Sequence, residues 1–223
     1  MPVVLAGLLL AAVVMLLFGG TELDRGLLLL LGEAAGPQLR QVAAALLTMA
    51  SPLPVMVATG AGAGFLLVRG GWRPALLLAA CGVGAALLAL LLGGATRQLR
   101  PGPGEIVYPT QEQLFPDPVA LSAAAAALAL AFLLTRRMPW RALALYIAAA
   151  FALTAGIARL LLGLAWPSDV IGGWAIGLCW TLLLLSMAGE DLGDGTPRPL
   201  RHSPRKGEPH DRESQNRDRP PDR

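Results

Sequence analysis

An arginine and an aspartate stand ten residues apart in a stretch, Ala158 to Gly173, that contains no other charge. Arg159 lies inside one apolar segment and Asp169 begins the next, with the sequence Trp-Pro-Ser between them. Charged groups at membrane depth are costly and usually mark a function or an ion pair. A guanidinium makes forked hydrogen bonds to oxyanions, so Arg159 is a candidate for binding phosphate.

The composition is that of an integral membrane protein. Of the 223 residues, 55% are hydrophobic and 15% are charged, whereas soluble domains carry about 25% charged residues. The net charge of +3 is spread over loops and a tail. It forms no basic face interleaved with aromatic residues, which argues against nucleic acid as a partner. Cys81 and Cys179 fall in apolar segments and are expected to be buried hydrophobes.

The apolar segments predict an all-α, polytopic bundle of about six transmembrane helices. The expected spans are residues 3–19, 53–68, 75–95, 119–135, 142–164 and 170–188. The fourth, rich in alanine, suits a position surrounded by protein. In the second span, Gly60 and Gly64 stand four apart, which permits close helix packing.

Four regions follow from this pattern. Residues 1–20 are expected to form an uncleaved first helix, because no basic stretch marks a signal peptide. Residues 21–52 mix charges with apolar stripes and are expected to lie along the membrane interface. Residues 53–188 are expected to form a membrane core of five helices. Residues 189–223 are rich in charge and proline and are expected to be a disordered cytoplasmic tail.

The arginines set the expected orientation. One side of a six-span protein carries the tail, with its eight lysines and arginines, and five loop arginines: Arg69, Arg73, Arg136, Arg137 and Arg141. The positive-inside rule then places both termini in the cytoplasm of a cell inner membrane. The loop at 96–118 and the turn at 166–168 face outward together.

Three motifs meet on that outer face: Arg100-Pro101, the run from Phe115 through Asp117 and Pro118 to Ala120, and the stretch from Arg159 to Asp169. In order and spacing they resemble the type 2 phosphatidic acid phosphatase superfamily, which includes lipid phosphatases, undecaprenyl-diphosphate phosphatases and vanadium haloperoxidases. The resemblance extends over roughly residues 20–188. It implies a lipid-phosphatase fold and an association with lipid phosphates.

The catalytic positions of that family are changed. In members of the family, a third-motif histidine attacks phosphorus and a second-motif histidine protonates the leaving oxygen. The matching positions here are Ala165 and Val119, which can do neither. The family's first-motif lysine and third-motif serine are replaced by Gly93 and Ala158. No residue is therefore assigned a catalytic role.

The retained arginines have two interpretations each. Arg100 and Arg159 are phosphate-binding candidates by the resemblance. Alternatively, Arg100 is a solvated interfacial arginine, and Arg159 snorkels to the surface or pairs with Asp169. Asp169, which orients the histidine in the family, is also well placed to cap a helix start.

The second motif is altered at Asp117 and Pro118, where the family has serine and glycine. The change removes a hydroxyl and a backbone N–H from the expected anion cradle. It also adds a carboxylate that repels phosphate. We expect Asp117 to pair with Arg100 or Arg97.

These residues favour a non-catalytic, cofactor-free and metal-free member of the family, a pseudoenzyme. Its expected partner is membrane lipid: it binds a phospholipid or polyprenyl-phosphate headgroup, or acts as a membrane scaffold. The first alternative is an active lipid or undecaprenyl-diphosphate phosphatase with a non-standard nucleophile, such as Asp117 or an activated water. The second is a small transporter or flippase.

Overall fold

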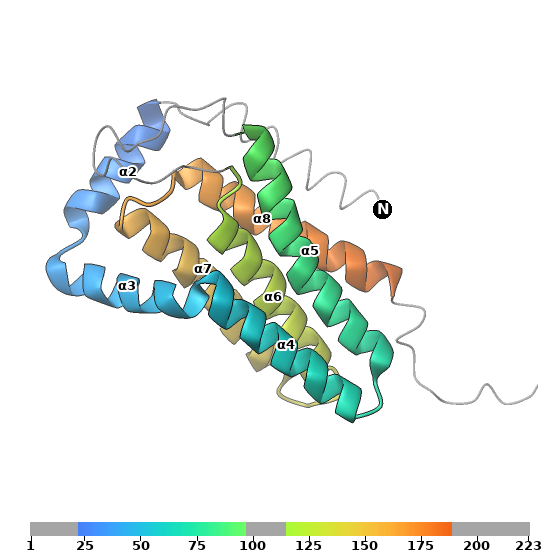
Figure 1. Ribbon diagram of the computed structural model, residues 1–223. Helices are drawn as coiled ribbons and strands as arrows, with labels where there is room; N and C mark the ends of the chain where they lie inside the picture. Colours follow the sequence, from blue (N-terminus) through green and yellow to red (C-terminus); the bar gives the residue numbers. More distant parts are fainter. Residues whose placement is uncertain (1–21, 97–114, 189–223) are drawn as a thin grey trace, which may run out of the picture. The chain divides into compact units, whose positions relative to one another are not determined.

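The computed structural model describes residues 22–96 and 115–188, which form helices and no strands and belong to the same compact unit. The helices of these two ranges are shown in Figure 1: α2 (Glu22–Ala34), α3 (Pro37–Ala50), α4 (Pro52–Val68), α5 (Trp72–Thr96), α6 (Pro118–Thr135), α7 (Arg141–Leu161) and α8 (Pro167–Met187).

The all-helical membrane architecture is confirmed for these residues. Helices α5, α6, α7 and α8 are each long and apolar enough to cross a membrane. Helices α3 and α4, which meet at a bend of 45°, qualify together as a fifth crossing. The full count of six stays a prediction. Its first span (1–20) and the tail (189–223) lie outside the described residues.

Proline and glycine define many of the helix ends. Proline is the first residue of α3, α4, α6 and α8, a position where its missing N–H is not needed and its fixed φ suits the helix. Gly70 and Gly163 follow α4 and α7 with φ of 77° and 67°. Glycine adopts this left-handed conformation without strain. The turn at Gly163 thus ends α7 shortly after Arg159 and leads the chain to α8, where Asp169 lies in the first turn.

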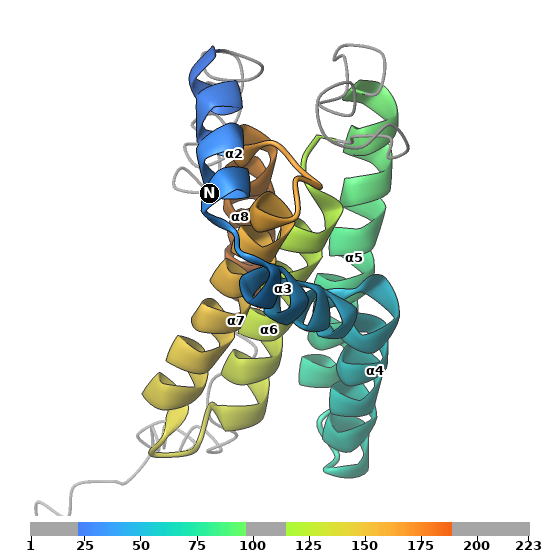
Figure 2. The same cartoon turned by 90° about the vertical axis from the view of Figure 1, so that its left-hand side faces the viewer.

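The predicted interfacial segment, 21–52, is packed against the bundle. Figure 2 shows α3 crossing between α2 above it and α4 below it. At the end of α3, Ala50 is fully buried with Ala123 of α6 and Ala155 of α7. Leu28 of α2 is also buried. These contacts attach the segment to the helical core, and its position at a membrane surface stays a prediction.

Helix α6 is the centre of the bundle and contacts α4, α5, α7 and α8. Half of its membrane window is buried inside the protein, compared with 28–33% for the other three candidate spans. Its alanines allow the surrounding helices to approach closely. The prediction that this helix is surrounded by protein is confirmed. Cys81 and Cys179 are buried and free, as expected.

Glycines of α8 face α6 at backbone distance. A Cβ atom on Gly177 would lie 2.5 Å from the carbonyl oxygen of Leu121, and one on Gly173 would lie 2.8 Å from that of Asp117. Within α4, the predicted packing role of Gly60 and Gly64 is wrong for the described helices. Cβ atoms there would meet nothing within 4 Å, whereas one on Gly62 would meet Leu130 of α6.

Candidate functional site

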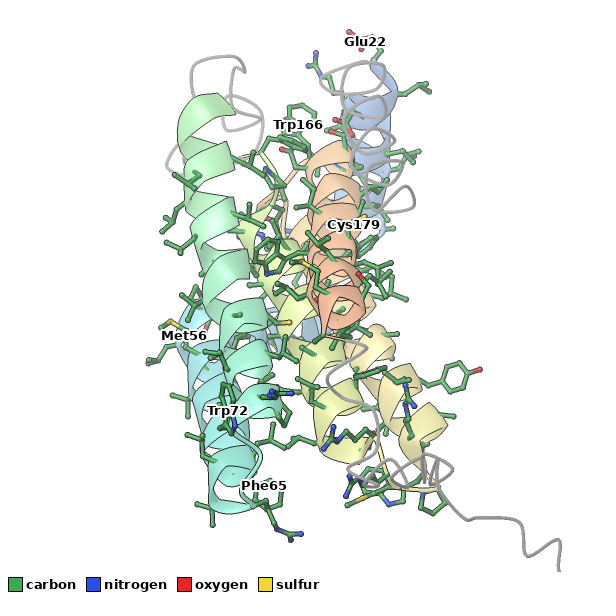
Figure 3. The ribbon with its side chains drawn as sticks, turned by 90° about the vertical axis from the view of Figure 1, so that its right-hand side faces the viewer. Glu22, Met56, Phe65, Trp72, Trp166 and Cys179 are labelled. Carbon is green, nitrogen blue, oxygen red and sulfur yellow. The ribbon has the colours of Figure 1, made fainter. Side chains whose placement is uncertain are left out.

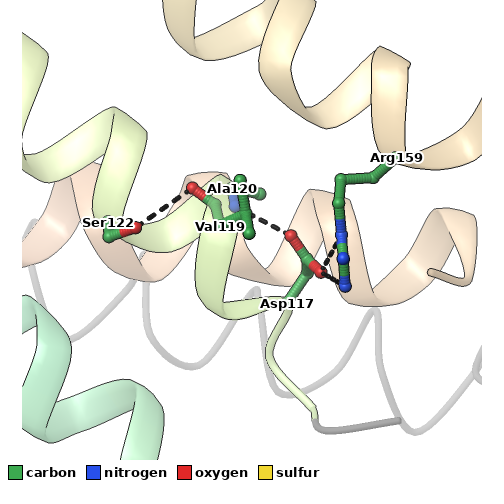
Figure 4. A network of polar contacts seen from close by, with 5 residues as sticks. All are labelled: Asp117, Val119, Ala120, Ser122 and Arg159. Carbon is green, nitrogen blue, oxygen red and sulfur yellow. Dashed lines mark hydrogen bonds and ion pairs between the residues drawn. The ribbon is translucent and has the colours of Figure 1, made fainter. Parts of the chain in front are cut away.

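The centre of the site is an ion pair between Asp117 and Arg159 (Figure 4). The Nη2 and Nε atoms of Arg159 lie 2.6 and 2.8 Å from the same carboxylate oxygen, Oδ1 of Asp117. The Asp117 side chain is 1% exposed and the Arg159 side chain 17%. Charged hydrogen bonds of this length are stronger than neutral ones. The pair therefore fixes α7 to the start of α6.

Asp117 has a second role as the N-cap of α6. Its other oxygen, Oδ2, accepts a hydrogen bond of 2.8 Å from the backbone N–H of Ala120. Pro118 follows as the first helical residue. Aspartate at the N-cap and proline directly after it form a strong helix-start signal. The altered second motif thus builds a well-capped helix end in place of an open anion cradle.

The same segment is joined to α8. The backbone N–H of Asp117 donates to the carbonyl oxygen of Asp169 at 3.0 Å. Nearby, a Cβ atom on Gly172 would lie 2.5 Å from the ring of Phe115. The two glycines after Asp169 therefore leave room for the chain from Phe115 to Leu121. The structure brings the second and third motifs together, as their resemblance implied.

One expected pairing is corrected, and another lies outside the described residues. Asp117 pairs with Arg159, and its expected partners Arg97 and Arg100 both lie outside the described residues. Arg159 pairs with Asp117 and not with Asp169. Asp169 is 2% exposed in the first turn of α8, where its charge meets the positive end of the helix dipole. Arg159 is thus a member of an ion pair, as one of its interpretations expected, but its partner is Asp117.

Val119 and Ala165, which the motif resemblance places at the family's histidine positions, lie in different apolar clusters. Ala165 is 3% exposed and packs with Ala120 and Val170. Val119 packs against the cluster of Ala50, Ala123 and Ala155. Neither side chain carries a lone pair for attack on phosphorus or a proton for a leaving oxygen. Within the described ranges, no three His, Cys, Asp or Glu side chains are arranged to hold a metal ion.

A further carboxylate, Asp24, was not singled out by the sequence. It is 4% exposed on α2, and its two oxygens accept hydrogen bonds from the backbone N–H and the hydroxyl of Ser168, at 3.0 and 2.7 Å. The first N–H groups of a helix lack partners within the helix. Asp24 therefore caps α8 from a position 144 residues earlier in the chain. No local signal connects residues so far apart.

Replacing Asp24 with alanine is expected to lower the free energy of unfolding by about 1–2 kcal/mol, because the N-terminus of α8 loses its acceptor. The measurement is thermal unfolding of the full chain in detergent micelles. Glu22→Ala is the matched control, since it removes an exposed carboxylate from the same helix. Equal losses in the two variants would show that Asp24 contributes only its charge.

A family model matches a part of the chain that includes Arg159. Residues 119–191 match the PAP2 superfamily. The match runs from the second residue of α6 through α7 and α8, and it contains the whole third motif, from Arg159 to Asp169. The resemblance inferred from the motifs is confirmed.

The fold agrees with this match. The chain is similar to the crystal structure of a transmembrane PAP2 type phosphatidylglycerolphosphate phosphatase from Bacillus subtilis, with a TM-score of 0.71 and 22% sequence identity. The similarity covers 85% of this chain and 98% of that one. No curated protein sequence matches the chain. The protein is thus a multi-pass membrane protein with a PAP2-type fold.

Proposed function

We propose that this protein is a non-catalytic PAP2-fold membrane protein whose phosphate position is filled by its own Asp117 carboxylate. The observation that carries the proposal is the contact of two Arg159 nitrogens with Asp117 Oδ1, at 2.6 and 2.8 Å. Arg159 is the arginine that the resemblance assigns to phosphate. Its guanidinium edge is already used by an anion from within the chain.

Electrostatics support this proposal. A lipid phosphate at Arg159 would have to displace Asp117 or lie beside it, and two anions repel most strongly where water is scarce. Asp117 is held in place by the α6 cap and by its backbone bond to Asp169. The Asp117 carboxylate therefore competes with a lipid phosphate for Arg159 as a tethered group, which has a high effective concentration there. Headgroup binding at Arg159 is accordingly weak, and the protein acts mainly as a membrane scaffold.

We further infer that the protein resides in the inner membrane with both termini in the cytoplasm and the Asp117–Arg159 pair toward the outer face. The five arginines of the opposite helix ends support this orientation through the positive-inside rule.

The catalytic part of the proposal is tested by phosphate release. Purified protein in liposomes is incubated with phosphatidic acid, phosphatidylglycerol phosphate or undecaprenyl diphosphate. We expect release at the rate of liposomes without protein, because Val119 and Ala165 supply neither acid nor nucleophile. Sustained turnover would overturn the proposal in favour of a phosphatase with a non-standard nucleophile. Loss of that turnover in Asp117→Asn would then identify Asp117 as the group involved.

A gain-of-function series tests whether the fold still supports the chemistry. Val119→His with Ala165→His restores the two family histidines but leaves Arg159 paired with Asp117. We expect no activity from this double variant, and activity only after Asp117→Ser and Pro118→Gly are added. Activity in the double variant alone would show that Asp117 does not block the site.

A further inference from the structure

Five arginines lie at the helix ends farthest from the Asp117–Arg159 pair, a region termed the basic end. It comprises the α4–α5 turn, the α6–α7 turn and the adjoining residues, with Arg69, Arg73, Arg136, Arg137 and Arg141. Figure 3 shows Phe65 and Trp72 at this end of the bundle and Glu22 and Trp166 at the other. Along α7, Arg141 and Arg159 are separated by about 27 Å, at 1.5 Å per residue.

The described helices that form the basic end contain no acidic residue near it. The sequences from Pro52 to Thr96 and from Pro118 to Ser168 have no aspartate or glutamate. Within the described part of the chain, no carboxylate pairs with Arg69, Arg136, Arg137 or Arg141. The basic end therefore carries a positive charge that the surrounding helices do not neutralise.

Several of these guanidinium groups lie against aromatic rings. The Cζ atom of Arg141 is 4.3 Å from the ring centroid of Phe132, and that of Arg69 is 4.9 Å from Phe65. Such cation–π contacts hold a guanidinium by its flat face. The N–H groups at its edge stay available to hydrogen-bond a phosphate in the forked geometry that arginine favours.

The basic end adjoins apolar side chains that face away from the protein. Trp140 is 50% exposed at the α6–α7 turn, and Trp72 is 61% exposed at the start of α5. Tyr146, one and a half turns into α7, is 75% exposed. Exposed tryptophan and tyrosine are typical of the level at which lipid headgroups meet the hydrocarbon. These exposed aromatic side chains favour a position of the neighbouring arginines at headgroup level.

A cavity of about 360 Å³ lies at the same end, between α5 and α8. Trp72 and Arg73 line it together with apolar residues that include Leu76, Leu184 and Met187. Apart from Arg73, the lining is apolar. This wall suits the acyl chain of a lipid whose headgroup lies at the basic end.

We propose that the basic end binds the headgroups of anionic phospholipids in the surrounding leaflet. This site is separate from the Asp117–Arg159 pair and independent of whether the protein is catalytic. Lipid is favoured over an acidic protein segment because the arginines adjoin exposed tryptophan, tyrosine and leucine side chains. An anionic lipid contacts the arginines with its headgroup and these apolar side chains with its acyl chains, whereas an acidic segment contacts only the arginines. Each arginine near an anionic membrane surface adds its own share to the electrostatic attraction. This attraction decreases over a distance of about one Debye length, so it becomes weaker in high salt.

The test uses the full-length protein in detergent micelles, with thermal unfolding followed by tryptophan fluorescence. Dioleoyl phosphatidylglycerol is titrated in one series and dioleoyl phosphatidylcholine in the other. The proposal expects the midpoint to rise with the anionic lipid alone, and the rise to diminish at high salt. Equal shifts with the two lipids would overturn it.

The decisive variant is Arg136→Gln/Arg137→Gln/Arg141→Gln, compared with Arg25→Gln, which removes an exposed arginine from α2 near the opposite end. The triple variant is expected to need about tenfold more phosphatidylglycerol for the same shift, because three attractive charges are lost. Arg25→Gln should behave as the wild type. The single variant Arg137→Gln, at an exposed turn position, covers the case in which the triple variant does not fold, with a smaller loss in the same direction.

Two outcomes overturn the proposal. An unchanged lipid dependence in both the single and the triple variant would show that the basic end does not contact lipid headgroups. Binding of poly-glutamate by the wild type, with no response to phosphatidylglycerol, would reassign the surface to an acidic protein partner.

Discussion

Replacing Arg159 with methionine is expected to lower the free energy of unfolding by about 3 kcal/mol. Methionine keeps an apolar stem but has no guanidinium, so Asp117, which is 1% exposed, becomes a buried carboxylate without its counter-charge. Removing one partner of a buried pair is more damaging than removing both. Chemical or thermal unfolding in detergent micelles measures the loss.

A double variant separates the loss of the pair from the stranded charge. Asp117→Asn combined with Arg159→Met is expected to recover at least half of the unfolding free energy that Arg159→Met alone loses. Asparagine still caps α6 and carries no charge. Arg137→Met is the surface control and should change stability by less than about 0.5 kcal/mol. If Arg159→Met were no worse than this control, the ion pair would contribute nothing to the fold.

The second large effect is expected from Gly177→Ala, with a loss of about 2 kcal/mol. A Cβ atom there would lie 2.5 Å from the carbonyl oxygen of Leu121 and 3.1 Å from the Cβ of Ala124. Backbone cannot move aside as a flexible side chain can, so α6 and α8 must separate. Because Asp117 is the N-cap of α6, the displacement also reaches the ion pair with Arg159.

Gly60→Ala provides the matched comparison within α4. Its Cβ atom would meet nothing within 4 Å, and alanine is the better helix former by up to about 1 kcal/mol. We expect this variant to be neutral or more stable in the same unfolding measurement. Destabilisation of equal size at Gly60 and Gly177 would mean that general helix effects, and not the α6–α8 contact, decide the outcome.

The sequence predicts the helical membrane class and the place of the site well. Both follow from local signals: long apolar runs for the spans, and the fixed spacing from Arg159 to Asp169 across a short turn. The buried position of α6 is also predictable, because its alanine content suits a helix surrounded by others. These features need only neighbouring residues to be compared.

The contacts across the fold are not predictable in the same way. Arg159 reaches Asp117 over 42 residues, and Asp24 reaches Ser168 over 144. Charge alone allowed Asp117 to be matched with several arginines, and the three-dimensional packing of α6 on α7 selects one. Similarly, the spacing of Gly60 and Gly64 shows that they share a helix face, but it does not show which helix packs on α4. The glycine that faces α6 is Gly62.

The central claim is that Asp117 occupies the position of a phosphate at Arg159. Its most direct test is the affinity of the wild type and of Asp117→Ser for phosphatidic acid in nanodiscs of phosphatidylcholine. Serine keeps the N-cap of α6 and removes the carboxylate. Glu22→Ser, which removes an exposed charge from α2, controls for the general change in charge.

Asp117→Ser is expected to bind phosphatidic acid about tenfold more tightly than the wild type, equivalent to about 1.4 kcal/mol for one charge-assisted contact regained. Glu22→Ser should match the wild type. An affinity for phosphatidic acid that does not change in Asp117→Ser would contradict the claim.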